Sequence, residues 1–258
     1  MLFSIITINR NNANNLETTI KSIISQDSSL YEFIIIDGAS TDNSLDIIKK
    51  YKAYIDYYIS EPDKGIYNAM NKGIAKAKGK YAIFMNSGDL FSYSTVLNDI
   101  SKNELNADFI FCGWNRMKNG KHLASYLPGK QITLYTLFYY STCICHQAMF
   151  TRVAVLKELQ GYDENLKISA DICFVMKALG IYYKTYQSLP YYIANLDVEG
   201  MSNSPKGLAI LNEEKPAYFK RLFPYVYDDY VKMHKYFRFS PMNIIRHLQW
   251  RLWKDKSR

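Results

Sequence analysis

The chain has 258 residues, 48% of them hydrophobic, which is enough for a substantial core in one large or two small domains. Its net charge is +8, but the segment from Val231 to Arg258 holds eight Lys and Arg against one Asp, so the remainder is close to neutral. A near-neutral body argues against a nucleic-acid partner, because nucleic-acid binding places a basic stripe on the folded domain.

Five short apolar runs in the first half of the chain predict strands. They are Leu2–Ile8, Phe33–Ile36, Tyr57–Ile59, Tyr81–Met85 and Phe109–Phe111. Their β-branched and aromatic residues are typical of strands buried on both faces. Between them, apolar residues recur at three- and four-residue spacing, which predicts helices from Leu16 to Ile24 and from Ile66 to Ala77, and another beginning near Ser40–Asp42. This alternation indicates βαβ units and an α/β fold.

Polar residues follow four of these strands. They are Thr7, Asn9 and Arg10 at the end of the first; Asp37, Gly38 and Ser40 after the second; Lys64, Gly65 and Asn68 after the third; and Asn86, Ser87, Gly88 and Asp89 after the fourth. Because ligands of open α/β sheets bind beyond the carboxyl ends of the strands, we expect these side chains to form one site.

Four shorter motifs follow in the second half. They are His146-Gln147, Gly161-Tyr162-Asp163-Glu164, Ser169-Ala170-Asp171 and Glu199-Gly200-Met201-Ser202. No apolar run reaches the roughly 18 residues of a membrane span. The first residues, Met1–Ile8, lack a preceding basic stretch and are expected to be a strand, not a signal peptide. The four cysteines show no C-x-x-C pair, which fits a reducing cytosol.

Taken in this order, the motifs resemble those of family 2 glycosyltransferases, which are inverting enzymes with a GT-A fold, and in particular the bacterial members that build capsule, colanic-acid or O-antigen repeats. The resemblance is close from Met1 to about Asp89 and sparser beyond it. It implies a mixed, mainly parallel central sheet flanked by helices in residues 1–230, with a nucleotide-sugar-binding half (1–112) and an acceptor-binding half (113–230). Residues 231–258 would form a basic, aromatic, helical C-terminal extension.

The resemblance implies that the donor is a nucleotide-sugar, with UDP as the expected nucleotide. The residues expected to bind it are Thr7, Asn9, Arg10, Asp37, Gly38, Ser40, Lys64, Gly65, Asn68, Asn86, Ser87 and Gly88. Chemistry supports several of these roles. Asp37 can accept a hydrogen bond from the base or the ribose, and Lys64 beside Gly65 can meet phosphate charge at a helix N-terminus. Family members usually carry Asp in place of Asn68.

The same resemblance assigns a divalent cation, Mn²⁺ or Mg²⁺, to Asp89, where it would neutralise the leaving diphosphate. Asn86-Ser87-Gly88-Asp89 keeps only one carboxylate of the family's common D-x-D element. We therefore expect a cation that the protein itself holds weakly.

Asp171 matches the family's catalytic base, which removes the proton of the acceptor hydroxyl. Glu164, in the family's G-x-D-E turn, is the second candidate. Cys173 stands where a second acid is often present. The resemblance implies that Asp163, His146, Gln147 and Ser202 lie on the acceptor side.

These assignments predict an enzyme that transfers one sugar from a UDP-sugar to a hydroxyl of a lipid-linked oligosaccharide in surface polysaccharide synthesis. The alternative is a catalytically inert nucleotide-sugar-binding partner subunit, which the missing carboxylates at Asn68, Asn86 and Cys173 keep open.

The C-terminal segment from Val231 to Arg258 interleaves basic residues with aromatic and aliphatic ones, including Trp250 and Trp253. This pattern is typical of a helix in a membrane interface, and equally of a helix that packs on its own domain. The first interpretation places the protein in the cytoplasm, peripherally at the inner face of a bacterial plasma membrane. A homo-oligomer is left open.

Overall fold

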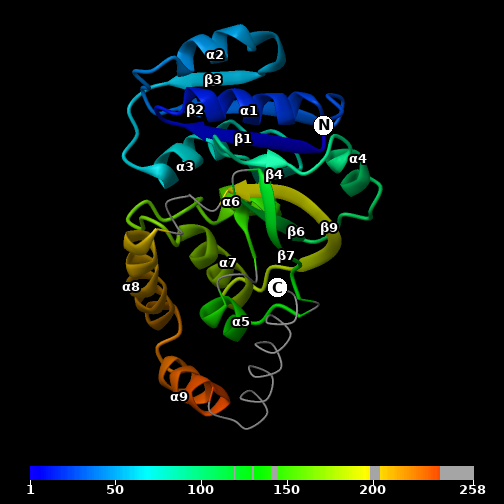
Figure 1. Cartoon of the computed structure of the whole chain (residues 1–258). Coiled ribbons are helices and arrows are strands. Elements are labelled where there is room, and N and C mark those ends of the chain that lie inside the picture. The colour runs from blue at the N-terminus through cyan, green and yellow to red at the C-terminus, as the bar shows by residue number, and fades with distance from the viewer. Residues whose placement is uncertain (119, 130, 141–143, 198–203, 239–258) are drawn as a thin grey trace. The chain divides into compact units, whose positions relative to one another are not determined.

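The computed structural model describes residues 1–118, 120–129, 131–140, 144–197 and 204–238 (Figure 1). The chain divides into two compact units, Met1–Lys215 and Pro216–Arg258. The boundaries expected from the sequence, after residues 112 and 230, stay predictions.

The first unit is built on a mixed sheet. Its strands are β1 (Phe3–Asn9), β2 (Tyr31–Asp37), β3 (Tyr57–Ser60), β4 (Tyr81–Phe84), β5 (Leu90–Phe91), β6 (Phe109–Lys118), β7 (Lys121–Tyr126), β8 (Met149–Arg152) and β9 (Tyr186–Asp197). The order across the sheet is β3-β2-β1-β4-β8-β6-β9-β5, and β7 pairs with β6. Pairs β3–β2, β2–β1, β1–β4 and β6–β9 are parallel, whereas β5, β7 and β8 pair antiparallel with their neighbours. The parallel strands β1 to β4 therefore end at one common edge.

Helices lie between these strands in the chain and follow the last of them. They are α1 (Ala13–Ile24), α2 (Ser44–Lys50), α3 (Ile66–Lys76), α4 (Val96–Ser101), α5 (Leu134–Tyr139), α6 (Val153–Glu158), α7 (Ala170–Gly180), α8 (Pro205–Leu222) and α9 (Tyr227–Arg238). The described residues also form two short 3₁₀ turns, η1 (Lys52–Tyr54) and η2 (His146–Ala148).

The two faces of the first strands pack against different helices. Side chains alternate along a strand, so Ile5 of β1 points to the same core cluster as Leu16 and Ile20 of α1. Ile6 points to the other face and contacts α3 at Gly73, where a Cβ atom would collide with it. Each such fully buried aliphatic side chain contributes about 1.5–3 kcal/mol to folding. Every residue of β1 and β2 is buried, as the apolar runs predict.

The predicted strands and helices of the first half are confirmed within a few residues, except that β6 continues beyond the predicted Phe109–Phe111 to Lys118. The helix expected from Ser40–Asp42 begins at Ser44 instead. The reason is that Asp42 is used in the turn before it: Oδ1 accepts from Ser44 N at 3.0 Å and Oδ2 from Ala13 N at 3.0 Å. Asp42 therefore ties the starts of α1 and α2 together.

In the second unit, rings from the end of α8 and from α9 form a small aromatic cluster. Phe219 is fully buried and lies 4.9 Å from Phe223, 6.4 Å from Tyr227 and 5.4 Å from Tyr230, measured between ring centroids. The helical extension expected over 231–258 is described as far as Arg238, where α9 ends, and residues 239–258 lie outside the described part of the chain. None of the described helices combines the length and hydropathy that crossing a membrane would require.

Candidate active site

Asp37 lies at the carboxyl end of β2 and is fully buried. Its Oδ1 atom accepts hydrogen bonds from Asn9 Nδ2 at 2.8 Å and Ser40 Oγ at 2.5 Å. Its Oδ2 atom accepts from Ser40 N at 2.9 Å and Ser60 Oγ at 2.6 Å. These donors fill the acceptor positions of a carboxylate, so a nucleoside group would have to replace a serine hydroxyl to reach it. Asp37 therefore organises the ends of β1, β2 and β3.

Thr7 and Asn9 join the end of β1 to the loop after β4. Thr7 Oγ1 donates to the Met85 carbonyl at 2.7 Å, and Asn9 Oδ1 accepts from Ser87 Oγ at 2.7 Å. The Thr7 side chain is fully buried, and its assignment to the nucleotide-binding residues stays a prediction. Its hydroxyl connects β1 to the residue that directly follows β4.

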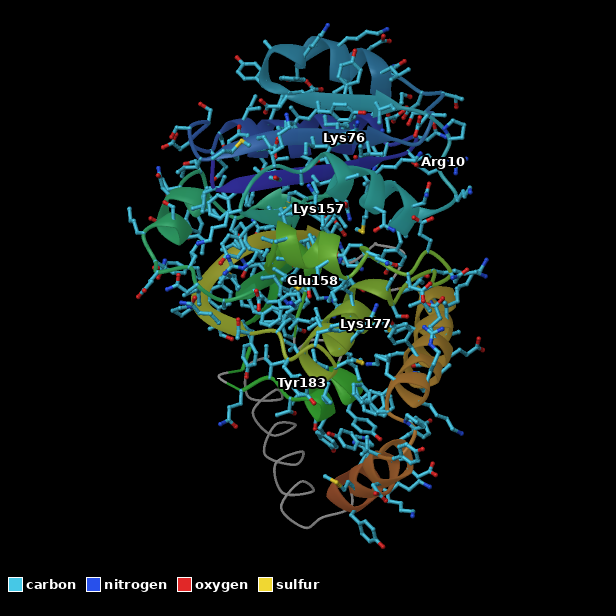
Figure 2. All side chains as sticks on the ribbon, turned by 180° about the vertical axis from the view of Figure 1, so that it is seen from behind. Arg10, Lys76, Lys157, Glu158, Lys177 and Tyr183 are labelled. Carbon is cyan, nitrogen blue, oxygen red and sulfur yellow. The ribbon has the colours of Figure 1, made fainter. Side chains whose placement is uncertain are left out.

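Two exposed cations stand at the same edge of the sheet. Arg10 follows β1 (Figure 2), and its side chain flanks Gly38 together with Asp63. Lys64 precedes Gly65, the residue that caps the N-terminus of α3. Neither Arg10 nor Lys64 forms an ion pair in the part of the chain that the structure describes. Both are therefore available to an anionic ligand such as a diphosphate.

The turn Asn86–Asp89 directly follows β4. Asp89 Oδ2 accepts from Asn86 N at 3.2 Å and from Gln147 Nε2 at 3.0 Å. Thr19 of α1 braces the turn, since its Oγ1 accepts from Gly88 N at 2.9 Å and donates to the Asp89 carbonyl at 2.9 Å. The turn is thus held by its own backbone, by α1 and by η2.

The residues of this turn fit a cation that a diphosphate helps to hold. Asp89 Oδ1 has no hydrogen-bond partner among the described residues. Burial raises the pKa of Asp89, and the charge of His146 and the hydrogen bond from Gln147 oppose this only in part, so a cation would favour the ionised form. Mg²⁺ sites often use one or two carboxylates together with substrate phosphates. Within the described residues, no three His, Cys, Asp or Glu side chains gather for metal binding.

Asp171 lies in the first turn of α7, and its side chain is 23% exposed. Its Oδ2 atom is 3.0 Å from His146 Nδ1, and its Oδ1 atom accepts a long hydrogen bond, 3.4 Å, from Tyr67. The other ring nitrogen of His146, Nε2, lies 3.2 Å from Asn86 Nδ2. The expected base is therefore connected through one imidazole to the turn that carries Asp89.

The pair of His146 and Asp171 favours its charged state. Burial alone would lower the pKa of His146, but the hydrogen bond to Asp171 and the charges of Asp171 and Asp89 raise it above its usual value. Burial alone would raise the pKa of Asp171, but the hydrogen bond and charge of His146 lower it. Asp171 is thus an ionised carboxylate, able to accept a proton.

Glu164 is held against α3 by two amides. Its Oε2 accepts from Asn68 Nδ2 and its Oε1 from Asn71 Nδ2, both at 2.9 Å. Asn71 also exchanges hydrogen bonds with the backbone of Tyr162, at 2.8 and 2.9 Å. Gly161 has φ +68°, and a Cβ atom there would collide with Asn71. Glycine is therefore required for the loop to lie this close to α3.

The remaining expected residues are engaged locally or lie outside the described residues. Asp163 Oδ1 accepts from Asn165 N at 3.1 Å and from Asn165 Nδ2 at 2.9 Å. Cys173, which stands where a second acid is often present, is buried, and its Sγ lies 3.7 Å from Ser169 Oγ. The side chain that contacts Asp171 Oδ2 is the imidazole of His146. Ser202 falls in residues 198–203, outside the described part of the chain.

The sequence analysis did not predict four residues that contact the site: Thr19, Ser60, Tyr67 and Asn71. Ser60 had a usable signal, because it ends β3 at the edge where the other polar residues gather. Tyr67 and Asn71 lie in a helix whose sequence distinguishes neither from an ordinary core or surface position. Their roles depend on contacts with residues about ninety to a hundred positions away in the chain.

A hollow of about 400 Å³ lies elsewhere in the first unit. Its lining residues are Ser125, Tyr126, Leu127, Gly129, Gln131, Ile132, Thr136 and Tyr140. The Tyr126 ring stacks on Trp114 with 4.4 Å between centroids. None of the lining residues belongs to the networks around Asp37, Asp89 or Asp171, so the hollow is separate from this site.

Comparison with solved structures defines the class of fold. TarS of S. aureus in complex with UDP-GlcNAc aligns with a TM-score of 0.66 at 20% identity, over 85% of this chain and 67% of that one. The mannosyltransferase PcManGT from Pyrobaculum calidifontis, in complex with GDP-Man and Mn²⁺, aligns with a TM-score of 0.57 at 14% identity, over 75% and 56%. The expected GT-A fold is confirmed.

Residues 4–159 match the model of glycosyl transferase family 2, so the chain belongs to that family and is a glycosyltransferase. It is 31% identical over 188 residues to an uncharacterised glycosyltransferase of Mycobacterium tuberculosis, covering 68% of each chain. It is 28% identical over 139 residues to TuaG of Bacillus subtilis, named for teichuronic acid biosynthesis, covering 52% of this chain and 55% of TuaG.

Proposed function

We propose that the protein transfers one sugar from a UDP-sugar to a hydroxyl of a lipid-linked oligosaccharide, with inversion, in the synthesis of a surface polysaccharide such as capsule or lipopolysaccharide. The observation that carries the proposal is the ionised Asp171, held by His146 next to the Asn86–Asp89 turn. Two comparisons support the donor and the pathway class: TarS is described in complex with UDP and with UDP-GlcNAc, and TuaG is named for a cell-wall polymer.

On the donor side, Arg10 and Lys64 attract the diphosphate, and the free N–H groups at the start of α3 add a favourable dipole. Asp89 would hold Mn²⁺ or Mg²⁺, and such a cation neutralises negative charge on a leaving diphosphate. Asp37 and Asn9 shape the pocket for the nucleoside. The serine hydroxyls bound to Asp37 are the groups that a ribose or base would replace.

On the acceptor side, the carboxylate of Asp171 takes the proton of the attacking hydroxyl. The freed oxygen forms a bond to C1 of the donor sugar while the bond from C1 to the diphosphate oxygen breaks, and UDP leaves from the opposite face. Asp171 Oδ1 is the oxygen for this task, because Oδ2 is engaged by His146. Glu164 is the second candidate for the base. Each Glu164 oxygen accepts a hydrogen bond of 2.9 Å, whereas the contact of Asp171 Oδ1 with Tyr67 is a long one of 3.4 Å.

The proposal is tested by offering a panel of UDP-sugars to the full-length protein with manganese and measuring released UDP. We expect release with at least one donor and faster release with a lipid-linked acceptor. A protein that binds UDP but releases none from any donor would establish the alternative, an inert nucleotide-sugar-binding subunit. The reason to test this alternative is that Asn68 and Asn86 carry amides at positions where carboxylates are common.

We also propose a cytoplasmic, peripheral position at the inner face of the plasma membrane, reached through residues 231–258. The support is the charge of that segment, which carries eight Lys and Arg against one Asp. A lipid-linked acceptor would be found at the same surface. Whether the protein forms a homo-oligomer is decided by its mass in solution.

A further inference from the structure

Two neighbouring side chains of one short turn engage two carboxylates that lie far apart in the sequence. The turn is η2, which precedes β8. His146 Nδ1 lies 3.0 Å from Asp171 Oδ2, and Gln147 Nε2 donates to Asp89 Oδ2 at 3.0 Å. Asp89 follows β4, whereas Asp171 belongs to α7.

In both cases the turn occupies one carboxylate oxygen and leaves the other available. Asp89 Oδ1 has no partner among the described residues. Asp171 Oδ1 has a long contact of 3.4 Å with Tyr67, and backbone N–H groups at the start of α7 also favour the ionised carboxylate. The turn therefore orients each carboxylate so that its second oxygen faces away from the holding side chain.

The orientation of both holding groups is itself determined. The Cys145 thiol donates to Gln147 Oε1, with 2.8 Å between the heavy atoms, so the amide nitrogen is the end that faces Asp89. Asn86 Nδ2 lies 3.2 Å from His146 Nε2 and holds the ring from its far side. The Asn86 side-chain oxygen is a buried acceptor without a partner among the described residues, so an amide rotated by 180° would accept from Nε2–H of a protonated His146. In either orientation Asn86 holds the imidazole from the side opposite Asp171.

We propose that His146 and Gln147 are positioning residues with separate tasks: His146 orients the base Asp171, and Gln147 orients Asp89 toward the donor diphosphate and its cation. The inference rests on the proposed roles of Asp171 and Asp89. It differs from the acceptor-binding role that the sequence motif implies for both residues. Groups that orient a ligand or a catalytic side chain from behind are typically worth about 10- to 100-fold in affinity or activity.

The test separates the two neighbours by the parameter each one changes. His146→Leu should lower kcat about 10- to 100-fold, while the affinity for UDP with manganese stays within about twofold. Gln147→Leu should weaken manganese-dependent UDP binding about 10-fold or more in calorimetry, with a smaller effect on kcat. His146→Gln keeps a donor amide of similar reach and should recover part of the lost kcat.

Two matched changes control for the substitutions themselves. His122→Leu lies on the exposed part of β7, and Gln131→Leu lies at an exposed position before α5, so both should behave like the wild type. Equal losses of kcat and UDP affinity in the His146 and Gln147 variants would mean that η2 has only a structural role, which overturns the proposal.

A wild-type protein that releases no UDP would overturn the proposed function. The positioning roles of His146 and Gln147 can still be tested by two measurements that need no enzymatic turnover. The first is the calorimetry of Gln147→Leu with UDP and manganese. The second is the ¹⁵N resonance of His146 Nδ1, which should move in Asp171→Asn and stay in place in Gln147→Leu. If the ¹⁵N resonance of His146 Nδ1 does not move in Asp171→Asn, the proposed positioning role of His146 would be overturned.

Discussion

His146 Nδ1 lies 3.0 Å from Asp171 Oδ2, and the two side chains are only 19% and 23% exposed. Each partner shifts the pKa of the other toward the charged state, against the effect of burial. The pair is thus an internal ion pair within the site, and its charge depends on pH.

The first prediction concerns stability against pH. The pKa of His146 is raised above 6.5, so its contribution is full below 6.5 and is lost as pH rises through the folded-state pKa. The pKa of Asp171 is lowered below 3.8, so its contribution is full above 3.8 and is lost as pH falls through the folded-state pKa. The pair therefore stabilises most between these two values. Urea unfolding should show a larger decrease in the free energy of unfolding from pH 5.5 to pH 8.5 in the wild type than in His146→Gln; equal decreases would contradict the ion pair.

The second prediction concerns the base. Asp171→Asn should reduce turnover by roughly 100- to 10,000-fold, the range for loss of a general base, and leave UDP affinity nearly unchanged. Steady-state kinetics and calorimetry measure the two effects. Asp46→Asn, on the exposed face of α2, is the matched control. If Asp171→Asn transfers sugar at a nearly normal rate, Glu164 would be assigned as the base instead.

The third prediction concerns the cation. Asp89→Asn should weaken manganese-dependent UDP binding, because the cation links the protein to the diphosphate. UDP binding without manganese should change much less, since Arg10 and Lys64 are unaffected. Calorimetry with and without manganese measures both quantities. Equal UDP affinity of the wild type under the two conditions would count against the role of Asp89.

The fold of the first half could be predicted because β1, β2 and β4 are mostly apolar and are buried along their whole length. The long strands β6 and β9 could not. Only Phe109–Phe111 was recognised in β6, since the strand continues through Trp114, Asn115 and Arg116 with mixed burial. Its outer part is stabilised by pairing with β7 and β9, which periodicity within one segment cannot reveal.

The candidate site was predictable where a side chain follows a strand or starts a helix, as Asp89 and Asp171 do. Which groups hold these carboxylates was not predictable. His146 reaches Asp171 across 25 positions and Gln147 reaches Asp89 across 58, and both contacts exist only after α7 and η2 pack together with the sheet. The burial of Thr7 was missed for a related reason: its hydroxyl turns toward Met85 of the neighbouring loop instead of toward solvent.

The fourth prediction concerns the loop that carries Glu164. Gly161→Ala combines a left-handed backbone, φ +68°, with a collision against Asn71. Gly120→Ala has a similar φ, +72°, but its Cβ would meet nothing within 4 Å, so it measures the backbone strain alone. We expect about 1 kcal/mol of destabilisation for Gly120→Ala and an additional 1–3 kcal/mol or so for Gly161→Ala, as for overpacking. Urea unfolding measures both; equal losses would show that Asn71 moves aside freely.

The last prediction concerns membrane binding by the C-terminal segment. Because α9 continues to Arg238, a chain ending there keeps that helix whole and removes five Lys and Arg together with Trp250 and Trp253. At about 1 kcal/mol per basic residue near an anionic leaflet, three of them in contact would supply about 3 kcal/mol, or roughly a hundredfold in affinity. The shortened chain should therefore lose binding to phosphatidylglycerol vesicles and still release UDP from its donor.

Charge is separated from chain length by substitutions in the full-length protein. Arg246→Gln, Arg251→Gln and Lys254→Gln together should reduce vesicle binding, whereas Lys49→Gln, Lys52→Gln and Lys102→Gln, at exposed positions of the first unit, should leave it unchanged. Salt should weaken binding of the wild type, because the attraction is screened within about 8 Å at physiological ionic strength. Two outcomes would contradict membrane binding: the full-length protein does not bind anionic vesicles, or the shortened chain unfolds. Either would show that the segment packs on the protein instead of on a membrane.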